Sequence, residues 1–179
     1  MVELFQIKFE FNTTEDRLLL SIFEKASSKK CVEYRFWFTR RFVAIFIKAI
    51  DRLIDQELAG DMQISPDAIG AVKKFQLEAV ISKADFSSSF AADNTNCSVF
   101  GENPLLAVTL KIHKKSKGKY ILSFLDNENK GVNIKAGMDL IYSLQKMIVD
   151  SVKSAAWNDP LFRARGQEIK TTEPPLFIS

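Results

Sequence analysis

The sequence contains one histidine, His113, and two cysteines, Cys31 and Cys97, which stand far apart without a CxxC pair. A protein zinc site needs closely spaced pairs of such ligands, so we expect no metal site. The scarcity of cysteine favours a reducing, cytoplasmic compartment, with one Cys31–Cys97 disulfide as the alternative.

The seven glycines are scattered, and the sequence holds neither a glycine-rich phosphate loop nor a GxSxG segment. We therefore expect no cofactor and no enzyme activity. The alternative, a small hydrolase, has to use His113 with Cys31, Cys97 or one of Ser87–Ser89 as the nucleophile. The alternation of the strand around His113 predicts an outward position for it. The apolar face of that strand is expected to consist of Leu106, Val108, Leu110 and Ile112.

Long apolar runs are missing too. The longest, Phe42–Ile47, is followed by Lys48 and is far shorter than the roughly 18 residues of a membrane span. Glu3 and Lys8 interrupt the first apolar residues, whereas a secretory signal keeps an unbroken apolar stretch. We expect a protein without an export signal or a membrane attachment.

The composition is that of a globular protein. The chain has 179 residues, of which 46% are hydrophobic and 26% charged. This predicts one globular domain over residues 1–157, followed by an extended tail over 158–179. The net charge of +3 and the pI near 8.8 are only mildly basic, so the distribution of charge matters more than its sum.

Residues 2–11 alternate between apolar and polar side chains, with the period of a half-buried strand. Two further strands are predicted over 17–24 and 31–38, each after a short polar turn. Three consecutive strands with short connections predict an antiparallel meander.

Two helices are predicted next. Thr39 is the expected cap of a helix over 39–59. A second helix, over 65–84, starts with Ser65 and Pro66, which are typical of a helix N-terminus. The connector is longer than that of a DNA-reading helix-turn-helix, so we expect a packed helical hairpin. The second helix is expected to bury Val72, Phe75, Ala79 and Val80.

Residues 85–104 form a long polar stretch, which indicates either a functional loop or disorder. A helix is predicted over 138–157, ending before Pro160. Between them, a second meander is predicted from strands over 105–113, 120–125 and 132–135. The predicted fold is α+β: an antiparallel sheet or small sandwich of two three-stranded meanders, with the helical hairpin inserted between them and a C-terminal helix.

Two adjacent arginines, Arg40 and Arg41, are the best functional lead. They fall at the positive end of a helix dipole, which is unfavourable unless an anion lies nearby. With Arg35 and Trp37 on the preceding strand, they predict a binding site for a phosphate or carboxylate. The alternative is that they pair with internal carboxylates or stack on aromatic rings.

Lysines are concentrated in the segment 111–119, which holds no acidic residue. The tip of this predicted hairpin is able to contact nucleic-acid phosphates. The alternative is a solvated turn whose charge prevents pairing at the sheet edge. The residues concerned are Lys111, Lys114, Lys115, Lys117 and Lys119.

Asp51 and Asp55 share one face of the first predicted helix. Lys48 stands three residues before Asp51, and Arg52 three residues before Asp55, which favours a surface ladder of ion pairs over an acid and base pair.

The segment Tyr34–Val43 (YRFWFTRRFV), with Glu78-Ala79 and Ala84-Asp85-Phe86, resembles a group of bacterial proteins of about this length that have no assigned function. The likeness covers residues 31–157. It implies a bacterial origin and no particular activity, ligand or site.

The order of the predicted elements is similar to that of the head domains of DNA end-joining scaffold proteins, as an analogy of fold alone. Those scaffolds continue into a long coiled-coil stalk, whereas the last helix here ends before Pro160.

These observations predict a non-enzymatic interaction module that forms a homo-oligomer or binds a protein partner, or binds an anionic ligand near Trp37, Arg40 and Arg41. One alternative is a nucleic-acid-associated protein that uses the lysines of 111–119 and the arginine pair. The other is the hydrolase that uses His113.

Overall fold

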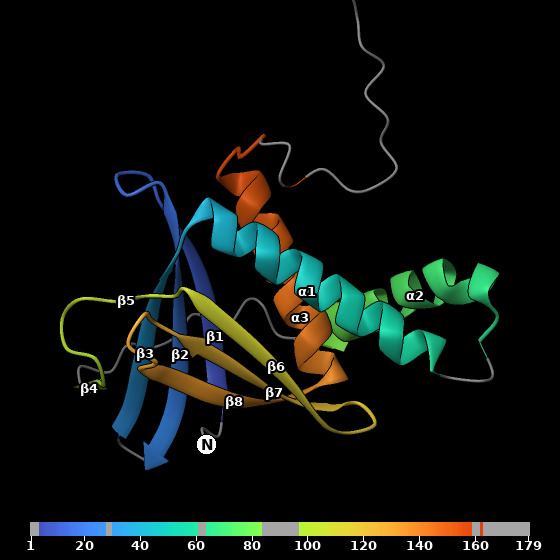
Figure 1. Cartoon of the computed structure of the whole chain (residues 1–179), viewed down its shortest axis with the longest axis horizontal. Coiled ribbons are helices and arrows are strands. Elements are labelled where there is room, and N and C mark those ends of the chain that lie inside the picture. Colours follow the sequence, from blue (N-terminus) through green and yellow to red (C-terminus); the bar gives the residue numbers. More distant parts are fainter. Residues whose placement is uncertain (1–3, 28–29, 61–63, 84–96, 159–161, 163–179) are drawn as a thin grey trace, which may run out of the picture.

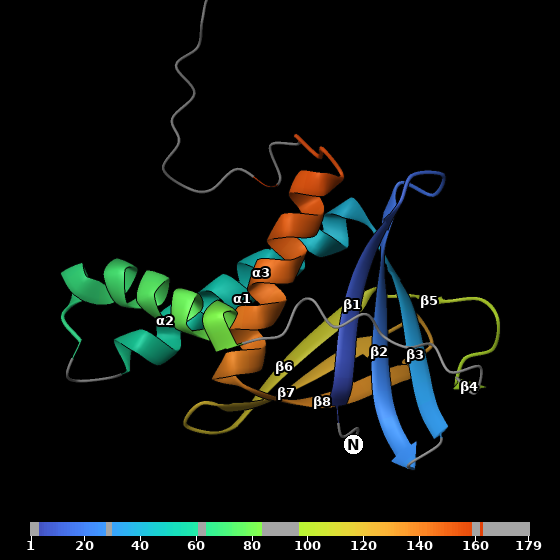
Figure 2. The same ribbon diagram turned by 180° about the vertical axis from the view of Figure 1, so that it is seen from behind.

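The computed structural model describes residues 4–27, 30–60, 64–83, 97–158 and 162. Two β-sheets lie one above the other, and the helices gather toward one end of them (Figures 1 and 2). The predicted α+β fold of two antiparallel meanders, a helical pair between them and a C-terminal helix is confirmed. The five-stranded sheet contains β1 (Leu4–Asn12), β2 (Arg17–Ser27), β3 (Lys30–Phe38), β4 (Cys97–Ser98) and β5 (Leu105–Leu106). The three-stranded sheet contains β6 (Thr109–Ser116), β7 (Lys119–Leu125) and β8 (Gly131–Gly137).

The first sheet joins an antiparallel meander to two short parallel strands. β1, β2 and β3 pair antiparallel in chain order, as predicted. Leu18, Leu20 and Ile22 alternate along β2 and are completely buried, because they face the second sheet and the helices. β4 and β5 then both pair with β3 in parallel.

The predicted strand over 105–113 is wrong, because the chain changes sheets inside it. Leu105 and Leu106 pair with β3, whereas β6 begins only at Thr109. The crossing is held by backbone hydrogen bonds to both sheets: the Ala107 N–H donates to the Trp37 carbonyl (3.0 Å) and the Val108 N–H to the Leu125 carbonyl (2.9 Å). The predicted apolar face fails here too, since Leu106 and Val108 are 40% and 48% exposed.

The second sheet packs its inner face on the first. Phe124 of β7 contacts Phe36 and Phe38 of β3, with ring centres 6.2 and 5.5 Å apart. The β6–β7 turn of this sheet is shorter than the segment 114–119 that the predicted strands leave between them, because Ser116 already pairs with Lys119. Gly118 takes a φ of 68° there, a conformation that glycine adopts without strain.

Helix α1 (Arg40–Ala59) starts as predicted. The Thr39 hydroxyl accepts a hydrogen bond from the Phe42 N–H at 3.2 Å. The buried side of α1 closes one end of the sandwich, where Phe46 contacts the Phe124 ring at 5.7 Å. The remaining buried residues of this side are Phe42, Val43, Ala44, Ile50, Leu53, Ile54 and Leu58.

The second predicted helix begins as a short 3₁₀ turn (Pro66–Ala68) and continues as α2 (Ile69–Lys83). Val72 and Val80 pack against the core, as expected. Phe75, which we expected to be buried, is 70% exposed. Apolar residues lie on all sides of α2, so the pattern does not choose the face that packs on α1 and α3.

The last helix, α3 (Met138–Ser154), is shorter than the predicted 138–157. Its inner face buries Ile141, Leu144 and Ile148, which recur at helical spacing. Of the predicted tail, only residues 158 and 162 are described, and the predicted polar stretch 85–104 is described only from 97 onward. Among the described segments, no helix is long and apolar enough to cross a membrane.

Candidate functional site

Arg40 is partly exposed but makes its contacts within the protein. Its Nε and Nη2 atoms lie 2.8 and 2.7 Å from Asp16 Oδ2, and its guanidinium lies 5.2 Å from the centre of the Trp157 ring. The Trp157 indole N–H donates to Asp16 Oδ1 at 2.9 Å. The hydrogen bond from Trp157, followed by that from Arg40, lowers the pKa of the Asp16 carboxyl. Arg40 thus joins the β1–β2 turn to the start of α1 and the residues after α3, which is the internal pairing considered as its alternative.

Arg35 and Trp37 lie on the outward face of the five-stranded sheet. An Arg35 Nη2 proton is donated to the carbonyl of Gly101 (3.1 Å), and a second contact reaches the carbonyl of Glu102. Trp37 is half-buried and pairs with Leu106 of β5. Arg35 therefore fastens the 101–102 turn to β3, and the four residues predicted to form an anion site do not share one cluster of contacts.

Arg41, in contrast, is exposed, and it starts a basic stripe along α1. The stripe continues with Lys48 and Arg52, about two and three helical turns further on, and Ile45, 50% exposed, lies between Arg41 and Lys48. Within the described part of the chain, none of these three cations pairs with a carboxylate. The stripe thus presents three unneutralised charges to solvent.

The ladder of ion pairs predicted for Lys48 and Arg52 is not formed. Asp51 and Asp55 instead accept from Lys73 of α2, at 3.4 and 3.1 Å. Because α2 packs on the side of α1 that carries both carboxylates, Lys73 pairs with them there, and its single charge offsets one of the two.

The three-stranded sheet presents a second basic surface. The outward residues are those that alternate with the buried ones of β7 and β8. By register, Lys111, Ser123 and Asn133 form one row across the sheet, and His113, Ile121 and Lys135 form the next. Lys115 and Lys119 are exposed near the turn. The three strands contain no aspartate or glutamate.

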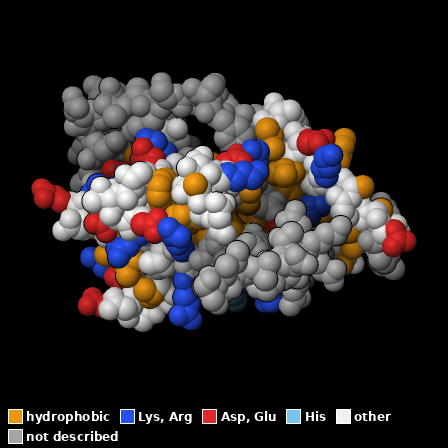
Figure 3. All heavy atoms as spheres, turned by 90° about the horizontal axis from the view of Figure 1, so that it is seen from above, with side chains coloured by type: hydrophobic (Ala, Val, Ile, Leu, Met, Phe, Trp, Pro, Cys, Tyr) orange, Lys and Arg blue, Asp and Glu red, His pale blue; other side chains and the backbone are white. Residues whose placement is uncertain are grey.

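The helix that carries the stripe and the three-stranded sheet lie on the same side of the molecule. In Figure 1, α1 and β6–β8 lie toward the viewer, and in Figure 2 both lie behind β1–β3 and α3. From above, by contrast, cationic, anionic and apolar side chains are intermixed (Figure 3). We call the exposed cations of α1 and of β6–β8 the basic face. It consists of Arg41, Lys48, Arg52, Lys111, Lys115, Lys119 and Lys135.

Glu57 connects the two halves of the basic face. Its carboxylate accepts from Lys114 Nζ (2.6 Å), from the Gly118 N–H (2.7 Å) and from the Tyr120 hydroxyl. Burial raises the pKa of this carboxyl, but the hydrogen bonds from Lys114, Tyr120 and Gly118 lower it by more, so that it lies below the ordinary value. The C-terminal end of α1 is thereby fixed to the β6–β7 turn.

Of the predicted lysines, Lys111, Lys115 and Lys119 are exposed and have no ion-pair partner among the described residues, whereas Lys114 is bound to Glu57. Lys117 lines a cavity behind the turn. Lys135, which the sequence analysis did not single out, stands across Ile121 from His113. Lys135 lies far from the lysine cluster in the sequence, so its place beside that cluster follows only from the strand register.

His113 is exposed on the outer sheet face, as predicted. The serines considered as nucleophiles, Ser87–Ser89, lie outside the described residues. The strand register places Cys97 beside Val32, one residue from Cys31, so the two cysteines occupy neighbouring strands despite their separation in the chain. The described residues contain no group of three or more side chains suited to hold a metal ion.

Comparisons with protein-family models, with curated proteins and with solved structures find nothing that matches this chain.

Proposed function

We propose that this protein is a non-enzymatic binding module that associates with nucleic acid through its basic face. One observation carries the proposal: α1 and β6–β8, which lie on the same side of the molecule, carry exposed cations without carboxylate partners among the described residues, and the nearest carboxylates of α1 pair with Lys73 instead. Clustered, unpaired cations release counterions when they meet phosphates, which is the main source of sequence-independent affinity.

The composition of the basic face favours the phosphate backbone of a duplex. Its outward sheet positions carry no phenylalanine, tyrosine or tryptophan, so His113 supplies the one ring there on which a base of a single strand could stack. Ser123 and Asn133 lie between the lysines and supply the neutral hydrogen bonds that commonly reach phosphate oxygens. We therefore expect binding that depends weakly on sequence.

The arginine pair contributes one member to this function. Arg41 belongs to the basic face, whereas Arg40 fixes the start of α1 through Asp16 and Trp157. The anion binding expected at the helix start is thus proposed for Arg41 together with Lys48 and Arg52.

Self-association is a second proposal. Leu106, 40% exposed, lies beside the half-buried Trp37 on the outward face of the five-stranded sheet, and exposed apolar side chains of this kind favour protein contacts. Light scattering at high micromolar concentration tests it. We expect a species larger than the monomer, and a monomer under these conditions contradicts this second proposal without affecting the first.

The experiment for nucleic-acid binding is a titration of a short fluorescent DNA duplex, followed by anisotropy at low salt. The double variant Lys111→Ala/Lys135→Ala removes two charges from the basic face, and the control Lys74→Ala/Lys153→Ala removes two exposed charges from α2 and α3. We expect the first to weaken binding about tenfold and the control to change it about twofold or less.

Lys114 is a poor choice for this test, because its removal also breaks the bond to Glu57. No binding to duplex DNA or RNA by the wild type at low salt overturns the proposal. Equal losses in the two double variants overturn the assignment to the basic face.

A further inference from the structure

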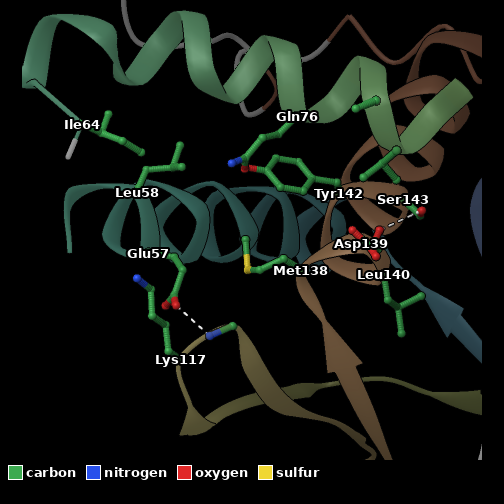
Figure 4. Close-up of a pocket in the computed structure, with 13 residues that line it drawn as sticks. Glu57, Leu58, Ile64, Gln76, Lys117, Met138, Asp139, Leu140, Tyr142 and Ser143 are labelled. Atoms are coloured by element: carbon green, nitrogen blue, oxygen red, sulfur yellow. Dashed lines mark hydrogen bonds between the residues drawn. The ribbon is translucent and has the colours of Figure 1, made fainter. Parts of the chain in front are cut away.

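A cavity of about 650 Å³ lies behind the β6–β7 turn, between the end of α1, α2 and the first turns of α3 (Figure 4). Its volume falls within the range of about 300–1,000 Å³ that is typical of sites for small molecules. It lies apart from the outward residues of the basic face. Much of its wall is apolar and consists of Leu58, Ile64, Ala79, Val80, Met138 and Leu140.

One polar group at this cavity has spare hydrogen-bonding capacity. The Tyr142 hydroxyl donates to Gln76 Oε1 at 2.6 Å, which fixes the orientation of the Gln76 amide. The amide nitrogen of Gln76 finds no acceptor among the residues that the structure describes. Figure 4 shows Gln76 and Tyr142 meeting between α2 and α3. The Nε2 protons are therefore available to a ligand that carries an acceptor.

The charges around the cavity disfavour an ionic ligand. Glu57 and Asp139 contribute carboxylates, and Lys117 contributes an ammonium group near Glu57 (Figure 4). The Glu57 carboxylate is already occupied by three donors. The two carboxylates repel an anionic ligand, and Lys117 repels a cationic one. The cavity therefore offers neither kind of ion a lining of purely opposite charge.

We propose that this cavity binds a small, uncharged, mainly apolar molecule whose hydrogen-bond acceptor takes a proton from Gln76 Nε2. Such a ligand contacts α1, α2 and α3 together. It therefore fastens α2, which otherwise attaches through Lys73, Gln76 and its apolar contacts, to the rest of the domain.

The test uses Nile red, a neutral apolar dye with a carbonyl acceptor, and the anionic dye ANS as its counterpart. We expect Nile red to bind with one saturable site per chain, and ANS to bind at least about tenfold more weakly. Absence of a saturable Nile red site overturns the proposal, and equal affinity for the two dyes overturns the uncharged class of ligand.

A matched pair of variants locates the dye. Ala79→Trp fills the cavity, whereas Ala71→Trp adds the same group to the exposed side of the same helix. We expect the first to weaken Nile red at least about tenfold and the second to leave it within about twofold. Equal affinity in both variants shows that the dye binds elsewhere and contradicts the assignment.

Gln76→Leu/Tyr142→Phe provides the second test, because it keeps the apolar volume and removes the amide together with the hydroxyl that donates to it. Loss of one hydrogen bond predicts Nile red binding weaker by about fivefold, with the far-ultraviolet spectrum unchanged. Unaltered affinity in this variant contradicts the role of Gln76. If Ala79→Trp does not fold, this comparison decides the proposal. The affinity for duplex DNA is expected to equal that of the wild type in Ala79→Trp and in the Gln76 variant, which distinguishes the cavity from the basic face.

Discussion

Replacing Glu57 by alanine tests how the basic face is held in place. The carboxylate is 9% exposed and accepts from Lys114, Gly118 and Tyr120. Alanine removes the acceptor and leaves the Gly118 N–H and the Tyr120 hydroxyl without their partner. The variant is therefore expected to loosen the contact between α1 and the β6–β7 turn and to destabilise the domain.

The magnitude follows from the three donors. A donor left without its partner in a partly buried position costs about 1–3 kcal/mol, and two are left here. The Lys114 side chain is 56% exposed, so its ion pair adds at most about 1 kcal/mol. We expect a loss of about 3 kcal/mol in the free energy of unfolding, and a fall in Tm of about 6–12 °C for a domain of this size.

Urea denaturation followed by circular dichroism measures the loss. Glu78→Ala is the control, since Glu78 is an exposed helical glutamate, and it is expected to change stability by less than about 0.5 kcal/mol. A loss below about 1 kcal/mol for Glu57→Ala refutes the reasoning, because the three hydrogen bonds are then not formed in solution.

The same bonds set a pH dependence. The pKa of Glu57 lies below its usual 4.5 in the folded protein, so its contribution to stability is complete above that value and is lost as the pH falls through the lowered pKa. The stability difference between the wild type and Glu57→Gln is therefore expected to shrink in acid. A difference that stays constant from neutral to acidic pH contradicts the assigned cause.

Other residues give further predictions. Phe124→Ala empties the centre of the sandwich and is expected to cost about 3–5 kcal/mol in urea denaturation, whereas Phe75→Ala is expected to change stability by less than about 0.5 kcal/mol; similar losses contradict the packing described. Burial, with added effects of Glu24 and Asp55, raises the pKa of Tyr34 and Tyr142 from 10.0 to about 12. The stability that the two neutral hydroxyls contribute is present below pH 10 and is lost as the pH rises toward 12. Spectrophotometric titration of the folded protein measures the ionisation of both tyrosines, and ionisation of either one near pH 10 contradicts the burial described.

The local elements of this fold were predictable because their signals are local. The alternation that buries Tyr120, Leu122 and Phe124 has a period of two, so it assigns the two faces of β7 without knowledge of the partner strands. Thr39 likewise caps α1 through an atom three residues from its partner.

The contacts between distant segments were not predictable in the same way. The parallel pairing of Leu105 with Phe36, and the meeting of Arg40 with Asp16 and Trp157, join residues whose proximity depends on the completed fold. No periodicity in one segment reports on them.

The errors of prediction have the same origin. Phe75 was expected to be buried from its helical spacing. Because α2 carries apolar residues on all sides, its spacing does not determine which face packs on α1 and α3, and Phe75 lies on an exposed face. Spacing along α1 predicted that Asp51 and Asp55 pair with cations of the same helix. Both carboxylates instead form ion pairs with Lys73 of α2, whose side chain is 25% exposed. That exchange frees Lys48 and Arg52, so the basic face emerged only from the structure.

The dependence of duplex binding on salt tests the central claim most directly. Log K for the wild type should fall linearly with the logarithm of the salt concentration, and Lys111→Ala/Lys135→Ala should reduce the slope by about 2, since each phosphate contact contributes about 0.9. The control Lys74→Ala/Lys153→Ala should leave the slope unchanged. A slope that is the same in the wild type and in the basic-face variant contradicts the claim that these lysines contact phosphates.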